Sequence, residues 1–499
     1  MAVSIIQAPL YRMLASGEEI IFVVDDATIV ATKFKVKFIA EVYIGTSGAG
    51  IFTQTKIATL KATPNNAGSG MFDLSRILES YVSPDYLGGT TVVASGVQHY
   101  TKSNQLNYST TPHTIHQIDK HSVNRNACRL FGVKFSVEYS DTIDGTLLNT
   151  TASPQNSTSY NIHNATRQED DILGYETQRG WFGYSYDYHD FVLLDIHGKF
   201  LTNAPTTQHI GENDYCTIGY FAQSDDAIGQ DSELGATIGT STATRELVYQ
   251  ITIQFYRADG STTGSAIDYR SNQANGSLTW LSNNPRANIQ YTGVGTANIK
   301  GAGETVPTDW AYYTVLAFDN SSTPQQISKP YYFYKQEVCK GFEKIRLTWL
   351  NRLGVWDYFN FTKKNVRKVN SKRETYQQIK GDWNEKIYSK KSYKGGTKTF
   401  STNSKEVIDL QTDYITEDEA AWLEELFTSS DVFVLQERST DAAASTANPT
   451  STIYQVKNKY VQPCIVMSKS YTRKTTANDK LKQYTVQIEM SHKKVIQRA

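Results

Sequence analysis

Residues 345–361 have the sequence IRLTWLNRLGVWDYFNF, and this stretch decides the fold class of the chain. Apolar and polar side chains alternate on both sides of a polar turn, Asn351-Arg352-Leu353-Gly354. Alternation with a period of two, interrupted by a turn that contains glycine, predicts a β-hairpin. No cofactor chemistry requires this spacing, so the hairpin is expected to be a building block of the fold.

The composition of the whole chain extends this prediction. The chain has 499 residues, of which 12% are aromatic, with 32 Tyr, 20 Phe and 7 Trp but only 5 Met. Aromatic residues together with abundant Thr, Ser, Asn and Gly favour strands and turns over helices. A chain of this length exceeds what one hydrophobic core usually organises. We therefore expect a mainly β protein, with multi-domain antiparallel β-sandwiches of the immunoglobulin-like type and a C-terminal α+β domain.

The N-terminal block contains the clearest strand patterns. Residues 33–44 (KFKVKFIAEVYI) and 129–139 (RLFGVKFSVEY) each alternate apolar and polar side chains, as half-buried antiparallel strands do. Asp73 is the expected N-cap of a short helix, LSRILESYV, which ends before Ser83-Pro84. Strands followed by one short helix predict an immunoglobulin-like sandwich with a helical crossover.

The middle of the chain is expected to contain aromatic-rich strands joined by long polar loops. Gly/Ser/Thr/Asn-rich composition predicts surface loops over 224–244 and 258–308. The expected strands are 181–201, 214–222, 246–261 and 310–319. The predicted domains are a β-sandwich with a short helix at 1–145, a polar linker at 146–170, a middle β-rich domain with long loops at 171–334, and an α+β domain with a basic hairpin at 335–499.

One helix is expected in the last domain. Thr416 and Glu419 form a capping box, and the apolar pairs Trp422/Leu426 and Leu423/Phe427 follow at helical spacing. Strands are expected at 431–436, 452–461, 464–472 and 482–496. The aromatic residues expected to form the structural core are Trp349, Trp356, Tyr358, Phe359, Trp422 and Phe427.

The charge of the chain is zero overall but unevenly distributed. Residues 1–334 contain 21 Lys+Arg against 31 Asp+Glu, and the rest contains 29 against 19, so the two parts carry −10 and +10. Within the second part, residues 363–405 contain 13 basic and 3 acidic residues. Parts of opposite charge favour head-to-tail stacking of copies, while a solvated, Lys-rich hairpin is the simpler alternative. The residues expected to form the contact surface are Lys363, Lys364, Arg367, Lys368, Lys372, Arg373, Lys390 and Lys391.

Membrane, secretion and redox signals are absent from the sequence. No window approaches 18 consecutive apolar residues, and the N-terminus lacks the basic and apolar regions of a signal peptide. The four cysteines are far apart, which favours free thiols made in a reducing cytoplasm over zinc ribbons or disulfides. They are Cys128, Cys216, Cys339 and Cys464.

Three patterns suggest chemistry, each with a simpler interpretation. HTIHQIDKH contains His113, His116, Asp119 and His121, which could hold zinc, but the spacing is not preorganised and an exposed loop is expected. YSYDYHDFVLLDIH contains Asp187, His189, Asp190, Asp195 and His197; Asp187 and Asp195 could in principle form a glycosidase pair, but the alternation instead fits a strand edge with polar residues facing water. Segment 363–405 interleaves its cations with Tyr376, Trp383, Tyr388 and Tyr393, but it matches no nucleic-acid-binding signature. We therefore expect no cofactor, no metal, no catalytic residues and no nucleic-acid partner.

Three segments carry a resemblance to a known class of protein. They are FDLSRILESYV (72–82), GFEKIRLTWLNRLGVWDYFNFTKK (341–364) and SYTRKTTANDKLKQYTVQIEMS (470–491). These segments resemble motifs in virion proteins of tailed phages that infect Bacteroidetes, both crAss-like and marine flavobacterial. The resemblance covers the N-terminal block and most of the last 160 residues, and it carries over no catalytic or ligand-binding residues. It implies a β-rich component of the tail, neck or baseplate, present in multiple copies around a symmetry axis.

The sequence thus predicts a non-enzymatic structural subunit of a phage virion. Its expected partners are copies of itself and other virion proteins, and its expected location is the virion tail or neck after synthesis in the bacterial cytoplasm. The alternative is a receptor- or carbohydrate-binding tail module, in which Trp181, Tyr184, Tyr186 and Tyr188 stack on sugars of a host-surface glycan. A depolymerase is disfavoured because no persuasive carboxylate pair is present.

Overall fold

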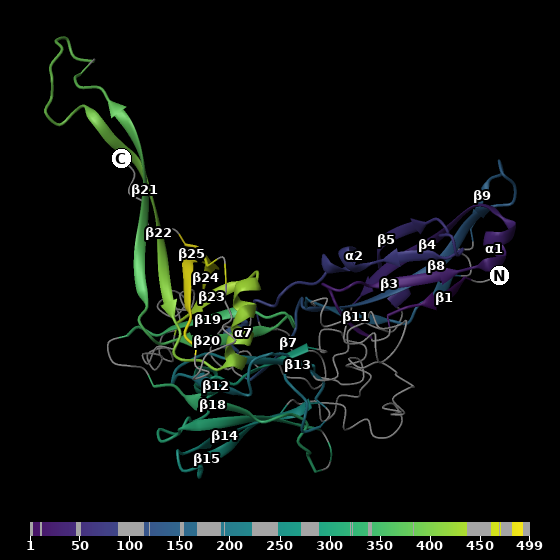
Figure 1. Ribbon diagram of the computed structural model, residues 1–499, viewed down its shortest axis with the longest axis horizontal. Coiled ribbons are helices and arrows are strands. Elements are labelled where there is room, and N and C mark those ends of the chain that lie inside the picture. Colours follow the sequence, from purple (N-terminus) through teal and green to yellow (C-terminus); the bar gives the residue numbers. More distant parts are fainter. Residues whose placement is uncertain are drawn as a thin grey trace. The chain divides into compact units, whose positions relative to one another are not determined.

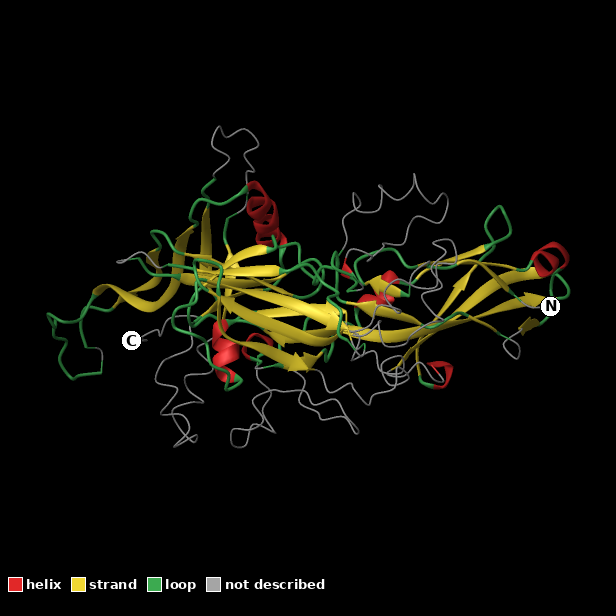
Figure 2. Ribbon diagram, turned by 90° about the horizontal axis from the view of Figure 1, so that it is seen from below, coloured by secondary structure: helices red, strands yellow, loops and turns green. Residues whose placement is uncertain are grey.

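A computed structural model gives the fold, and strands predominate in it (Figure 2). The structure describes residues 3–9, 12–45, 51–87, 114–118, 120–149, 154–166, 191–193, 195–221, 248–270, 289–319, 321, 323–337, 342–382, 384–436, 461–468, 470 and 482–492. The chain forms two compact units. Unit 1 comprises Met1–Gln336 together with Leu350–Asp357, and unit 2 comprises Glu337–Trp349 together with Tyr358–Ala499.

Unit 1 begins with two sheets that enclose one apolar core. The smaller sheet has the order β1 (Ser4–Gln7), β3 (Ile21–Asp25), β6 (Gly70–Asp73). The larger has the order β2 (Met13–Ala15), β11 (Tyr160–His163), β8 (Cys128–Ser140), β4 (Phe34–Gly45), β5 (Thr55–Ala62), with β9 (Leu147–Asn149) and β10 (Gln155–Asn156) also paired to β8. The short helices are α1 (Ala27–Thr32), η1 (Ile51–Thr53) and α2 (Ser75–Glu79).

Aromatic side chains from both sheets meet in this core. Phe135 of β8 lies 5.5 Å from Phe22 of β3 and 5.9 Å from Phe72 of β6, measured between ring centroids. All three are buried, because alternation along each strand directs every second side chain inward. The predicted strands at 33–44 and 129–139 are confirmed, and so is the mainly β, antiparallel character of the protein.

Two expectations for unit 1 are wrong in detail. Residues 160–163 lie in the predicted polar linker, but they form β11, and all four are buried because β11 pairs with both β2 and β8. The predicted loop 258–308 contains β15 (Thr262–Arg270), β16 (Ile289–Gly293) and α6 (Thr296–Gly301). β15 forms a hairpin with the preceding strand β14, whereas β11 and β16 pair with strands far away in the sequence, so local composition could not reveal their pairing. The four-domain division stays a prediction.

Unit 1 also contains a second pair of sheets. The five-stranded sheet has the order β12 (Thr207–Ile210), β18 (Tyr331–Lys335), β17 (Tyr312–Asp319), β14 (Val248–Tyr256), β15. The three-stranded sheet has the order β13 (Thr217–Phe221), β16, β7 (His121–Val123). The Tyr313 hydroxyl of the first sheet donates to the carbonyl of Val294, just after β16, over 2.9 Å. The buried Phe200 lies 6.1 Å from Tyr220 of β13 and 4.9 Å from Tyr331 of β18, measured between ring centroids, so the two sheets share a core.

The hairpin predicted from residues 345–361 is confirmed. Its strands are β19 (Ile345–Leu350) and β20 (Trp356–Phe361), and its turn belongs to unit 1. Asn351 shapes the turn, because its side-chain oxygen accepts hydrogen bonds from the N–H groups of Leu353 and Val355 at 3.0 and 3.1 Å. Gly354 has a positive φ of 83°, and a Cβ there would lie 1.7 Å from the carbonyl oxygen of Asn164. Only glycine fits this position.

Unit 2 is a seven-stranded antiparallel sheet with one helix. The strand order is β20, β19, β23 (Val432–Leu435), β24 (Val461–Val466), β25 (Thr485–Met490), β22 (Gly396–Gln411), β21 (Val366–Gln378). Helix α7 (Glu417–Thr428) begins at the predicted capping box of Thr416 and Glu419. The helix packs on the sheet through Trp422, whose ring centroid lies 5.1 Å from that of Trp349. Among the described residues, no helix has the length and apolar character needed to cross a membrane.

The two tryptophans of the hairpin strands allow a matched test of the hydrogen bond between Trp356 and Asp85. The Trp356 indole donates to the carbonyl of Asp85 over 2.9 Å, whereas the buried Trp349 indole N–H has no partner among the described residues. Trp356→Phe and Trp349→Phe remove similar apolar volume, but only the first leaves a buried carbonyl unsatisfied. We expect Trp356→Phe to lower the free energy of unfolding by about 1–2 kcal/mol more than Trp349→Phe does. Denaturant titration measures both, and an equal loss in the two variants would contradict this account.

Candidate functional site

The histidine motif does not form a metal site among the described residues. No group of three potential metal ligands occurs in the part of the chain that the structure describes, and His113 and Asp119 lie outside it. The expectation of an exposed loop is wrong for His116, which lies in the short helix η2 (Ile115–Gln117), and for His121 in β7. Both side chains are buried, because β7 pairs with β16 inside unit 1.

His121 is a structural member of a buried polar cluster. Its Nε2 lies 3.0 Å from the carbonyl oxygen of Tyr269, and its Nδ1 lies 2.7 Å from the hydroxyl of Thr292. Since a carbonyl only accepts, the ring donates through Nε2 and accepts through Nδ1. Burial, followed by the charge of Lys120, lowers the pKa of His121 to about 4, and the bond to Tyr269 opposes this. The imidazole is therefore neutral at pH 7.

Of the acidic pair and the sugar-stacking aromatics, Asp195 alone lies among the residues that the structure describes. Residues 167–190, which include Asp187 and the Trp181–Tyr188 segment, lie outside the described residues. Asp195 and His197 are exposed in a turn, where Asp195 accepts from the His197 backbone N–H at 2.7 Å. This hydrogen bond shapes the turn and gives Asp195 a local structural role.

The predicted basic hairpin forms a long two-stranded arm in unit 2. We call β21, β22 and the segment between them (residues 366–411) the β arm; Figure 1 shows its strands continuing past the end of β25. Only Val407–Gln411 of β22 pair with β25. Beyond Val407, the strands pair with each other from Val369 to Gln378, with no third strand among the described residues. A two-stranded ribbon without a covering layer is at most marginally stable in water.

Large apolar side chains are exposed along this ribbon and at its tip. Tyr393 is 69% exposed and Ile387 is 77% exposed. The other exposed apolar residues of the β arm are Val369, Tyr376, Ile379, Tyr388 and Phe400. Soluble monomers rarely expose many such residues on one element, so the arm has the character of a contact surface.

The cations of the β arm fall into two groups, which the sequence did not distinguish. At the base, Arg367 bridges Glu343 at 2.5 Å and Glu406 at 2.9 Å, and Lys368 pairs with Asp409. The other ion pairs near the base of the arm join Lys363 to Asp413 at 2.9 Å and Lys405 to Glu489 at 2.5 Å. These cations are neutralised within unit 2 and serve to anchor the arm.

Most cations farther along the arm have no ion pair among the described residues. Of the predicted contact residues, these are Lys372, Arg373, Lys390 and Lys391; Lys364, which precedes the arm, has none either. Segment 371–404 contains eight Lys+Arg and three Asp+Glu, and one of its cations, Lys394, pairs with Asp382. The distal part of the β arm therefore carries free positive charge beside exposed apolar groups.

The predicted core residues lie in the hairpin and in α7. Trp349, Trp356, Tyr358 and Trp422 are buried, whereas Phe359 and Phe427 are half-buried. Sequence analysis missed the exposed apolar residues of the arm, such as Ile387 and Phe400. The available signal was that β21 and the first half of β22 have polar side chains at both odd and even positions, which leaves neither strand face apolar.

Comparison with known proteins adds no assignment. A scan against protein-family models and a search of curated proteins each found no match to the chain. The β arm is therefore interpreted from its own geometry.

The buried imidazole of His121 predicts an acid-sensitive stability. Its folded-state pKa of about 4 lies below the ordinary value near 6.5, so the unfolded state binds a proton first as the pH falls. The stabilisation is complete above about pH 6.5 and is lost progressively down to about pH 4, by about 3 kcal/mol. His121→Gln, which can still donate to Tyr269, should be less stable at pH 7 but should show a shallower decline on acidification. Denaturant titrations between pH 7 and 4 test this, and parallel curves would contradict it.

The two groups of cations predict different effects on unit 2. The double variant Arg367→Gln/Lys368→Gln removes three exposed ion pairs, for which the expected total cost is about 1 kcal/mol or less. It should speed hydrogen exchange at residues 407–411, because the pairs of Arg367 with Glu406 and of Lys368 with Asp409 hold β21 against β22. The matched variant Lys372→Gln/Arg373→Gln, five residues along the same strand, removes equal charge and should leave this exchange unchanged. If the two variants changed the hydrogen exchange of residues 407–411 equally, the ion pairs at the base of the arm would not be its anchor.

Proposed function

We propose that this protein is a non-enzymatic structural subunit of a tailed-phage virion, in the tail, neck or baseplate, and that it assembles in multiple copies around the tail axis. The observation that carries the proposal is the β arm. Its distal half exposes apolar side chains and unpaired cations on a ribbon that no other described strand supports. Such a surface gains stability from contact with a neighbouring subunit.

The rest of the molecule fits an architectural role. We propose that the two sheets around Phe22 and Phe135 form an immunoglobulin-like sandwich, and that the sheet and helix of unit 2 form an α+β domain. The buried polar residues of unit 1 support the same role, since His121 and Asp85 are bonded to the surrounding backbone and side chains. The resemblance of three segments to phage virion proteins supplies the biological setting.

Charge supports assembly through copies of the same chain. The first 334 residues carry a net charge of −10, whereas the distal arm segment 371–404 is basic. A contact between unlike surfaces is heterologous, and a repeated heterologous contact forms a ring when its rotation closes and an open helical filament when it does not. Opposite charge speeds and orients such an encounter, and salt weakens it.

Arm truncation tests the proposed function. Residues 371–404 are replaced by Asn-Gly, which leaves Asn370 opposite Lys405 and retains the Lys405–Glu489 ion pair. We expect the full chain to form oligomers of defined mass at low salt that dissociate at about 1 M salt, where the Debye length is about 3 Å. The truncated chain should be a folded monomer at both.

Light scattering measures the mass, and the variant Arg367→Gln/Lys368→Gln serves as a control that changes arm charge at the base alone. A full chain that is monomeric at low salt would overturn self-assembly through the arm. Oligomers of unchanged mass after truncation would overturn the role of the arm in it.

A further inference from the structure

The outer face of the five-stranded sheet carries aromatic side chains in register across four strands. His209 of β12 is directly opposite Tyr334 of β18, Tyr334 is opposite Tyr312 of β17, and Tyr312 is opposite Tyr256 of β14. The ring centroids of Tyr334 and Tyr312 lie 5.1 Å apart, and those of Tyr312 and Tyr256 lie 4.9 Å apart. Their planes differ by 27° and 9°, so the three rings are stacked. We call these four residues the tyrosine row.

The tyrosine row lies at the surface. Tyr334 is 39% exposed, His209 is exposed, and Tyr312 and Tyr256 are half-buried. The side chains next to the row on the same strands point the other way and are buried in the core. They are Phe333, Phe255 and Tyr313. Stacking fixes the exposed rings before any partner arrives, which reduces the entropy lost on binding.

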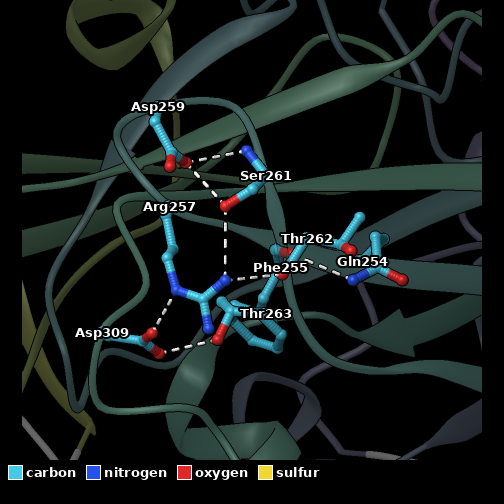
Figure 3. A network of polar contacts seen from close by, with 8 residues as sticks. All are labelled: Gln254, Phe255, Arg257, Asp259, Ser261, Thr262, Thr263 and Asp309. Atoms are coloured by element: carbon cyan, nitrogen blue, oxygen red, sulfur yellow. Dashed lines mark hydrogen bonds and ion pairs between the residues drawn. The ribbon is translucent and has the colours of Figure 1, made fainter.

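An ionised carboxylate lies beside the row, in the turn between β14 and β15 (Figure 3). Asp259 accepts hydrogen bonds from the N–H and the hydroxyl of Ser261 at 2.9 and 2.6 Å, which lowers the pKa of Asp259. The Arg257 guanidinium donates hydrogen bonds to the Asp309 carboxylate at 2.5 Å and to the carbonyl of Thr262 at 2.9 Å. Asp259 is thus left as the exposed acid of the turn.

The turn and the row lie close enough to act together. A Cβ on Gly260, next to Asp259, would lie 4.0 Å from the Tyr312 hydroxyl. Partial burial, the neighbouring phenols and the Asp259 carboxylate all raise the pKa of Tyr312, so its hydroxyl stays protonated at neutral pH. The surface therefore combines hydroxyl oxygens, aromatic rings and one negative charge, a set that suits Lys or Arg side chains flanked by apolar groups.

The distal β arm carries the matching chemistry. Lys372, Arg373, Lys390 and Lys391 have no ion pair among the described residues, and Ile387 and Tyr393 are exposed near them in the chain. We propose that the tyrosine row of one copy is the docking surface for the distal β arm of a second copy. This inference rests on the proposed function and names the surface through which copies associate.

Tyrosine substitutions test the docking surface. Tyr312→Thr/Tyr334→Thr removes the centre of the row with a residue that suits strands, and Leu316→Thr is the control because Leu316 is half-buried on the same face of β17. We expect the double variant to weaken self-association at least about tenfold, as the loss of central aromatic anchors does. The control should leave it unchanged, with hydrogen exchange confirming that both variants fold. Asp259→Asn keeps the acceptor for Ser261 and should make association less sensitive to salt.

Cross-linking gives a second test that does not depend on folding of the threonine variant. Tyr334 is replaced by the photoreactive p-benzoylphenylalanine, and this chain is mixed with an isotope-labelled wild-type chain. We expect mixed-isotope cross-links between position 334 and residues 371–404.

The outcomes separate the inference from the proposed function. Oligomers that require residues 371–404 but cross-link elsewhere, or that survive loss of the tyrosines, overturn the docking surface and leave the structural role standing. Cross-links confined to one chain also overturn it. Monomers under all conditions overturn both the docking surface and self-assembly through the arm.

Discussion

Asp85 is the residue on which the arrangement of unit 1 most depends. Its carboxylate accepts from the backbone N–H groups of Arg125 and Asn126, at 3.0 and 2.7 Å, and from the Tyr291 hydroxyl at 3.2 Å. Its backbone carbonyl accepts from the Trp356 indole. One residue therefore ties together the segment before β8, strand β16 and the turn of the hairpin. Because Asp85, Tyr291 and Trp356 are buried, loss of the Tyr291 hydroxyl or the Trp356 indole would leave a polar atom of Asp85 without water to replace its partner.

Asp85 and His121 make opposite contributions to the pH dependence of stability. Burial raises the pKa of Asp85 to about 6, although its three donors favour the charged form. The folded state thus holds this proton longer than the unfolded state, and the contribution of Asp85 to stability declines as the pH rises from about 4 to 6. His121 contributes more stability over the same rise, since its pKa is lowered. The two effects partly cancel, so the intact unit 1 should respond less to pH than either group alone.

Local features could be predicted from the sequence, and pairings between distant segments could not. The hairpin turn follows from Asn351 and Gly354, and the start of α7 follows from Thr416 and Glu419, because each uses contacts within a few residues. The burial of Tyr160 and Ile162 depends on strands β2 and β8. Because the residues around them in the sequence are polar, the sequence predicted a linker there. The tyrosine row is another case, since its members lie on four strands whose register is visible only in the folded sheet.

The same limit applies to the β arm, where Lys368 and Lys372 occupy equivalent positions in the sequence pattern. Asp409 neutralises the first, and no described acid reaches the second. This difference has a mechanical consequence. Ion pairs join both strands to the rest of unit 2, from Arg367 to Glu343 and from Lys405 to Glu489. An arm that is anchored at its base loses less freedom when its distal half is bound than a free segment would. In the proposed assembly, the paired cations would lower the entropic cost of binding, while the unpaired cations and exposed rings would form the contact itself.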